Sequence, residues 1–115
     1  MSESITADKS KAFALRIIKL YRYLCDEKHE YVLSKQLLKS GTSIGANVRE
    51  ARRGQSKADF YAKLNISLKE ADETEYWLEL LHDSGYIDDS QFAGIYADAE
   101  ELIKLLAATT KTQKN

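Results

Sequence analysis

The chain has 115 residues, of which 43% are hydrophobic and 30% are charged, with no proline and a single cysteine, Cys25. This length fits one domain around one core, and one cysteine excludes an intrachain disulfide or a zinc site with two cysteine ligands. Residues 1–13 lack the apolar core of a signal peptide, and no segment approaches the roughly 20 apolar residues that span a bilayer. We therefore expect a cytoplasmic protein that does not contact membranes.

The net charge of -1 conceals opposite charges in the two halves of the chain. Residues 1–57 contain 12 Lys+Arg and 6 Asp+Glu, a net charge of +6, whereas residues 58–115 contain 5 and 12, a net charge of -7. Such a division indicates an electrostatic role. Either basic and acidic helices attract one another inside one bundle, or a basic face binds a polyanion.

The first predicted helix covers residues 9–28, with Thr6 or Asp8 as its expected N-terminal cap. Its apolar residues recur at spacings of four, three and four, which is typical of one buried helix face: Phe13, Ile17, Leu20 and Leu24. The second predicted helix covers residues 31–53. Its apolar phase continues across Gly41, so we expect one continuous helix and not two helices separated by a stop.

The third predicted helix covers residues 57–84. Ser56 is followed three residues later by Asp59, a spacing that resembles a capping box, and Gly85 supplies a typical left-handed C-terminal position. The fourth covers residues 89–108. Four long helices with short connections predict an all-α fold, an antiparallel up-down four-helix bundle in which residues 1–115 form a single domain.

A polar stripe runs beside the apolar stripe of the second helix, so we expect its side chains to be half-buried and hydrogen-bonded. Its members recur at spacings of four, three, four and three: Gln36, Ser40, Ser43, Asn47 and Glu50. Ser67 and Glu70 on the third helix are plausible partners. The stripe is either a structural network that fixes helix register or a subunit contact. Gly41 and Gly45 share one face of the same helix and predict close packing on a neighbour.

The end of the second helix carries the most basic segment of the chain. Arg49, Arg52 and Arg53 share one side of the helix end, and Lys57 follows closely. Arginine suits phosphate recognition because its planar guanidinium offers a fork of donors. The same cations could instead complement the helix macrodipole. We predict these four residues as the nucleic-acid contact if the chain has one.

Signs of enzyme chemistry are weak. The pair Glu79 and His82 has the Glu-x-x-His spacing of di-iron bundles, but such sites need two of these motifs and two further glutamates. No phosphate loop, catalytic triad or paired carboxylates stand out. We therefore expect no catalytic residues, no metal and no cofactor.

Residues 37–51 (LLKSGTSIGANVREA) resemble the signature helix of bacterial four-helix bundle proteins known as the 23S rRNA-intervening sequence protein family. The resemblance continues through SLKE at 67–70, EYWLELL at 75–81 and GYI at 85–87, and spans about residues 10–106. It implies an antiparallel bundle that assembles into a homopentamer. It also implies kinship with the accessory protein of diversity-generating retroelements, a basic pentamer that binds nucleic acid and a reverse transcriptase.

We therefore expect a non-enzymatic, homo-oligomeric binding or adaptor protein. In one hypothesis its basic half contacts RNA or DNA weakly, with structured RNA favoured. In the alternative it is a protein-binding or structural oligomer with no nucleic-acid role. A contiguous exposed basic patch favours the first hypothesis, whereas basic residues paired with acids of the third and fourth helices favour the second.

Overall fold

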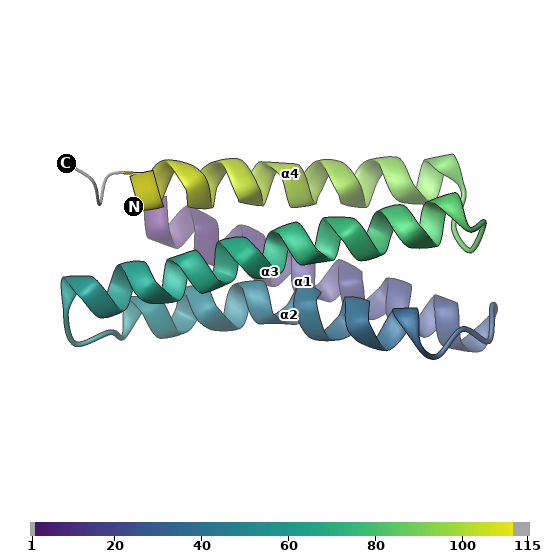
Figure 1. Cartoon of the computed structure of the whole chain (residues 1–115), viewed down its shortest axis with the longest axis horizontal. Helices are drawn as coiled ribbons and strands as arrows, with labels where there is room; N and C mark the ends of the chain where they lie inside the picture. The colour runs from purple at the N-terminus through teal and green to yellow at the C-terminus, as the bar shows by residue number, and fades with distance from the viewer. Residues whose placement is uncertain (1, 112–115) are drawn as a thin grey trace.

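A computed structural model describes residues 2–111, with side chains from residue 5 onward, and contains four helices in this range. They are α1 (Ser2–Asp26), α2 (Leu33–Arg52), α3 (Lys57–Asp83) and α4 (Asp89–Lys111). Successive helices run antiparallel, and the α2–α3 connection lies at the same end of the bundle as the start of α1 and the end of α4 (Figure 1). The prediction of an all-α four-helix bundle is confirmed. No helix within residues 2–111 combines the length and the apolar character needed to cross a bilayer.

The core runs along the axis of the bundle, and every helix contributes one apolar stripe to it. Its largest fully buried side chains come from all four helices: Phe13, Ile17, Leu24, Leu37, Ile44, Leu78, Leu81, Leu102 and Leu106. Consecutive helices pack against one another, and contact between α1 and α4 closes the bundle. Burial of these stripes is the main stabilising contribution, because an amphipathic helix gains most of its stability from tertiary packing.

Helix α1 begins at Ser2, two turns before the expected start at residue 9. Thr6 and Asp8 lie inside the helix, so the prediction that one of them caps it is wrong. The reason is visible in the burial pattern, since Thr6 and Ser10 are 3% and 1% exposed and continue the stripe of Phe13 and Ile17 toward the N-terminus. From residue 5 onward, the first two buried positions are occupied by hydroxyl residues, and an apolar pattern therefore does not reveal them.

Helix α2 begins at Leu33, two residues after the expected start, because the buried carboxylate of Glu30 receives the N–H groups at this end. Its Oε2 accepts from Val32 and Leu33 at 3.2 and 2.9 Å, and its Oε1 accepts from Ser34 at 2.7 Å. The Ser34 hydroxyl donates back to the Glu30 carbonyl at 2.7 Å. One acidic side chain thus satisfies three N–H groups that a helix start leaves without partners.

The remaining boundaries follow local rules of helix capping. Helix α2 is continuous through Gly41, as predicted. The Ser56 hydroxyl accepts from the Asp59 N–H at 3.0 Å and caps α3, and Gly85 has φ 88° after the end of α3. Asp88 and Gln91 cap α4 reciprocally, each side chain accepting the other's N–H at 2.8 and 2.9 Å. Helix α4 extends to residue 111, three residues beyond the predicted end.

Candidate functional site

The predicted basic segment lies at the C-terminal end of α2 and in the short connection to α3. Arg49, Arg52, Arg53 and Lys57 are all exposed. Backbone hydrogen bonds fix the connection, because Arg53 N–H donates to the Glu50 carbonyl and Gly54 N–H donates to the Ala51 carbonyl, both at 3.1 Å. Arg49 and Arg52 therefore lie in the last turn of α2, Arg53 follows in the connection, and Lys57 begins α3, all at the end of the bundle where α1 starts (Figure 1).

Three of these cations, Arg49, Arg52 and Arg53, line one groove of about 1070 Å³, whereas Lys57 does not contribute to its lining. The groove lies between α1 and α2 and extends over the α2–α3 connection to Lys63 of α3. Its lining also includes several small side chains: Ala7, Ser10, Ala14, Gly45 and Ala46. The structure thus shows that α1 lies beside the predicted basic segment and contributes residues to the same groove.

Small side chains line the groove because α1 and α2 approach closely beneath it. A Cβ atom at Gly45 would lie 3.2 Å from the Ser10 hydroxyl oxygen and 3.5 Å from the Ser10 carbonyl carbon. Gly41, one turn earlier on α2, faces Ile17 of α1 even more closely. The predicted glycine face of α2 is therefore packed against α1, and the close approach leaves backbone near the surface of the groove.

Ion pairs divide the basic half of the chain into two parts. On α1, Lys9 pairs with Glu101 at 3.3 Å, and Arg16 pairs with Asp98 of the same α4 helix. On α3, Lys63 pairs with Glu50 of α2 at 3.0 Å. Among residues 5–111, the cations predicted to bind nucleic acid have no such partner: Arg49, Arg52, Arg53 and Lys57. Attraction between helices therefore accounts for only part of the charge division, because Lys9 and Arg16 are the only cations of residues 5–57 that have an ion pair within residues 5–111, and the end of α2 is the densest cluster of those that do not.

The polar stripe of α2 divides between the interior and the surface. Ser40 and Ser67 are completely buried. The Ser67 hydroxyl donates to the Ile44 carbonyl at 2.8 Å, which ties α3 to the backbone of α2. The hydroxyl oxygens of Ser40 and Thr74 lie 2.9 Å apart, a second link between these two helices. The Glu70 carbonyl lies 2.7 Å from the same Thr74 hydroxyl, which can donate its one proton either to this carbonyl or to Ser40.

The expectation that the whole stripe is half-buried is wrong for Ser40, which is buried, and for Gln36 and Glu50, which are exposed; the Glu50 carboxylate pairs with Lys63 of α3 at the surface. Ser43 and Asn47 are half-buried but bond to their own helix: the Ser43 hydroxyl donates to the Lys39 carbonyl, and the Asn47 amide donates to the Ser43 carbonyl at 2.8 Å. Neither Ser67 nor Glu70 therefore bonds to the side chain of Asn47. Burial raises the pKa of the half-buried Glu70 carboxyl.

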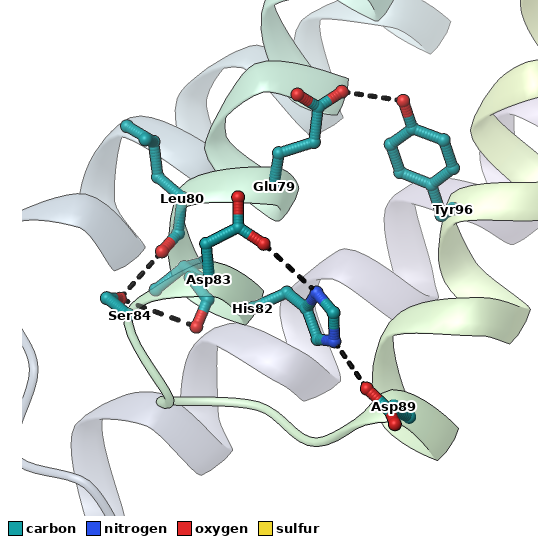
Figure 2. Close-up of polar contacts among 8 residues, drawn as sticks. Glu79, Leu80, His82, Asp83, Ser84, Asp89 and Tyr96 are labelled. Atoms are coloured by element: carbon teal, nitrogen blue, oxygen red, sulfur yellow. Dashed lines mark hydrogen bonds and ion pairs between the residues drawn. The ribbon is translucent and has the colours of Figure 1, made fainter.

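The side chains of Glu79 and His82 do not converge (Figure 2). Glu79 accepts a hydrogen bond from the Tyr96 hydroxyl at 2.6 Å, and this bond is the largest cause that raises the pKa of Tyr96. His82 instead lies between Asp83 and Asp89 and stacks on Phe92, with ring centroids 4.3 Å apart. No group of three or more His, Cys, Asp or Glu side chains suited to a metal ion occurs in the described part of the chain.

Lys11 and Thr74 were not predicted from the sequence. Lys11 lies on α1, far from the arginines in the sequence, and enters the groove only because α1 and α2 are neighbours. Thr74 occupies a buried position of α3, where a hydroxyl beside apolar residues gives no distinct signal. The spacing of Ser67 and Thr74, seven residues apart on one face of α3, is the one sequence feature that could have indicated two linked positions.

The sequence and the fold match one described family. The family model for 23S rRNA-intervening sequence protein matches residues 2–108. A crystal structure from Bacteroides thetaiotaomicron VPI-5482, described as a protein of unknown function from the S23 ribosomal protein family, is 55% identical to this chain. The match covers 96% of this chain and 99% of that one, with a TM-score of 0.95. No curated protein matches. The chain belongs to the 23S rRNA-intervening sequence protein family.

Proposed function

We propose that this chain is a non-enzymatic, homo-oligomeric binding protein that contacts nucleic acid through the C-terminal end of α2. The observation that supports this most strongly is the clustering, within nine positions at one end of the bundle, of four exposed cations that have no ion-pair partner among residues 5–111: Arg49, Arg52, Arg53 and Lys57. The names of the family and of its solved member, which refer to 23S rRNA and to a ribosomal protein, favour RNA as the nucleic acid.

Exposed arginines at a helix end suit phosphate groups, since each guanidinium can donate two parallel hydrogen bonds. Contacts of this kind depend on charge and not on base sequence, so affinity falls as salt rises. The net charge of -1 opposes strong attraction. We expect one subunit to bind with a dissociation constant of about 10⁻⁴–10⁻⁶ M, the range of non-specific contacts.

The homo-oligomer is supported by apolar side chains on the surface of one subunit. Leu15 of α1 is 59% exposed, and Tyr76 and Ile66 of α3 are 55% and 41% exposed. Large aromatic and aliphatic side chains of this kind are enriched at interfaces. A pentamer, the assembly that the family resemblance implies, would bring five basic ends to one strand and raise the apparent affinity. Light scattering should give a mass near five times 13.1 kDa, and a monomer at micromolar concentration would overturn this part.

The ion pairs from α1 to α4 favour a second candidate, an oligomer or protein-binding module with no nucleic-acid role. In that case the ion pairs of Lys9 and Arg16 stabilise the bundle itself. The cations at the end of α2 would then bind acidic side chains of another protein. Helices α3 and α4 of a second copy carry many such acids, including Asp72, Glu73 and Glu100.

Fluorescence anisotropy with labelled structured RNA separates these candidates. The test variant is Arg49→Gln/Arg53→Gln, and the control is Lys35→Gln/Lys39→Gln, which removes two exposed charges at the other end of α2. Arg52 is left intact because it also lines a small crevice beside Val48 and Phe60.

We expect the test variant to bind more weakly and to lower the slope of log affinity against log salt by about two, while the control retains most of the wild-type affinity. Failure of the wild-type protein to bind at low salt would leave the protein-binding candidate. Equal losses of affinity in both variants would show that nucleic acid binds to positive charge anywhere on the surface and not specifically to the end of α2.

A further inference from the structure

We infer that the groove between α1 and α2 holds the phosphate backbone of a double-helical nucleic acid, with Lys11 of α1 acting together with the arginines of α2. This rests on the proposed function and adds two statements to it. The first is that nucleic acid enters the groove and contacts both α1 and α2, in addition to the exposed arginines at the end of α2. The second is that a duplex is preferred to a single strand.

The charge of the lining supports an anionic occupant. Five cations line the groove, Lys11, Arg49, Arg52, Arg53 and Lys63, against three carboxylates, Asp8, Glu50 and Asp59. Lys63 and Glu50 neutralise each other at 3.0 Å. Four cations therefore remain against two carboxylates, and they come from α1, from α2 and from the connection to α3. A polyanion entering the groove would meet positive charge contributed by both of its helices.

The small residues of the lining allow an extended backbone to come close. Ala46 is exposed and Gly45 is half-buried, and Ala7 and Ala14 face the same groove from α1. The side chains of these four residues are at most a methyl group, so none of them projects far into the groove. Close approach matters for phosphate binding, because a charge-assisted hydrogen bond requires a separation of about 2.7–2.9 Å between donor and acceptor.

The composition of the lining distinguishes a duplex from a single strand. None of the residues that line the groove is aromatic, and none is histidine. Proteins that bind single strands without sequence preference stack bases on aromatic rings, at about 1–3 kcal/mol per base. The groove cannot supply this contribution. What it offers is fixed positive charge on rigid helices, which suits the regular and dense phosphates of a double helix.

The length of the groove agrees with this ligand. Its α2 side extends from Thr42 to Arg52, which is about 15 Å of helix at 1.5 Å per residue. Over that distance along its axis, one strand of a duplex presents about four phosphates, at about 3.4 Å each. Four cations without a partner among residues 5–111 line the groove: Lys11, Arg49, Arg52 and Arg53. Four cations therefore face about four phosphates, with the carboxylates of Asp8 and Asp59 in the lining lowering the net positive charge of the groove.

Two single substitutions test the groove without touching the arginines. Lys11→Gln removes the α1 cation. Ala46→Gln fills the groove with a neutral side chain of good helix propensity, and Ala97→Gln, at an exposed alanine of α4, is its matched control. Anisotropy is measured with labelled duplex RNA, duplex DNA and single-stranded RNA of equal length, as salt titrations. Circular dichroism melts confirm that each variant is folded.

We expect both duplexes to bind several-fold more tightly than the single strand, with a salt slope for the duplexes between about -3 and -4, as four phosphate contacts predict. Lys11→Gln should make that slope shallower by about one, and Ala46→Gln should weaken duplex binding several-fold while Ala97→Gln has no effect. If the arginine variant loses binding but Lys11→Gln and Ala46→Gln do not, or if the single strand binds as tightly as the duplexes, the groove inference is overturned and the proposed function stands. Absence of binding by the wild-type protein overturns both.

Discussion

A Cβ atom at Gly41 would lie 2.8 Å from Cγ1 of Ile17 and 2.9 Å from its Cγ2. Gly41 is buried and Ile17 is completely buried, so neither helix has free space at this crossing. A glycine inside a helix costs about 1 kcal/mol relative to alanine. The chain retains one here because it allows α1 and α2 to approach closely, and the apolar packing on both sides keeps α2 continuous.

Replacing this glycine should destabilise the protein, although alanine is the better helix former. Gly41→Ala forces the buried Ile17 to move, and overpacking of this kind costs about 1–3 kcal/mol. Gly94→Ala on α4 is the matched control, since its Cβ would meet only the flexible end of Arg16 and the position is exposed. We expect thermal melts to show a lower Tm for Gly41→Ala and a higher Tm for Gly94→Ala. A higher Tm for both variants would show that the α1–α2 contact accommodates the additional methyl group at little cost.

The hydrogen bond between Ser40 and Thr74 should stabilise the pairing of α2 with α3. Both side chains are buried, and Thr74→Val keeps the shape of the side chain while removing the hydroxyl. We expect a loss of about 1–2 kcal/mol in the free energy of unfolding, measured with urea. A double-mutant cycle with Ser40→Ala should give a coupling of about 0.5–1.5 kcal/mol. Additive effects of the two substitutions would contradict a direct bond.

The apolar pattern was sufficient to predict the four helices and the continuity of α2, because their buried stripes are long and regular. It failed where burial does not depend on apolar side chains. The start of α1 was missed because Thr6 and Ser10 are the buried residues there. The start of α2 was misplaced by two residues because the acidic Glu30, which precedes it, receives the first N–H groups of the helix.

The candidate site was predictable in part, as a set of nearby cations. The sequence places Arg49, Arg52 and Arg53 together, but it does not show which cations an acid neutralises, since partners such as Arg16 and Asp98 are far apart in the sequence. It also suggested that Asn47 bonds across to α3. The structure gives Asn47 a partner on its own helix, because the Ser43 carbonyl lies one turn away. Asn47→Ala should therefore have a smaller effect than Thr74→Val.

Glu75 should be a site where substitution stabilises the protein. Its Oε2 is buried and has no hydrogen-bond donor among residues 5–111. Burial raises the pKa of its carboxyl, and the nearby Glu100, Asp72 and Glu79 raise it further. The ionised form is therefore disfavoured in the folded state, and Glu75→Gln should raise stability at neutral pH by about 1 kcal/mol. A raised carboxyl pKa means that this advantage shrinks as the pH falls through that pKa. Equal gains in Tm at pH 4 and pH 7 would argue against ionisation as the cause.

His82 links the end of α3 to the start of α4 through charge. Its Nε2 lies 2.7 Å from Asp89 of α4, and its Nδ1 lies 3.3 Å from Asp83 of its own helix (Figure 2). Neutral imidazole has one N–H and can donate to only one of these carboxylates, whereas the imidazolium donates to both. The bond to Asp89 accordingly raises the pKa of His82 above its ordinary 6.5; burial opposes this in part, and Asp83 adds a smaller increase.

The sign of the resulting pH dependence follows from linkage. Because the folded state binds the proton more tightly, the stabilisation by His82 is fully present below about pH 6.5 and is lost as the pH rises through the raised pKa. We expect the Tm of the wild-type protein to exceed that of His82→Gln by more at about pH 6 than at about pH 8.5. Asp89→Asn should remove most of this difference, since it deletes the strongest partner while leaving the stacking of His82 on Phe92 possible. Parallel pH profiles for the wild-type protein and His82→Gln would show that the imidazole contributes only packing, because stacking on Phe92 does not require the proton.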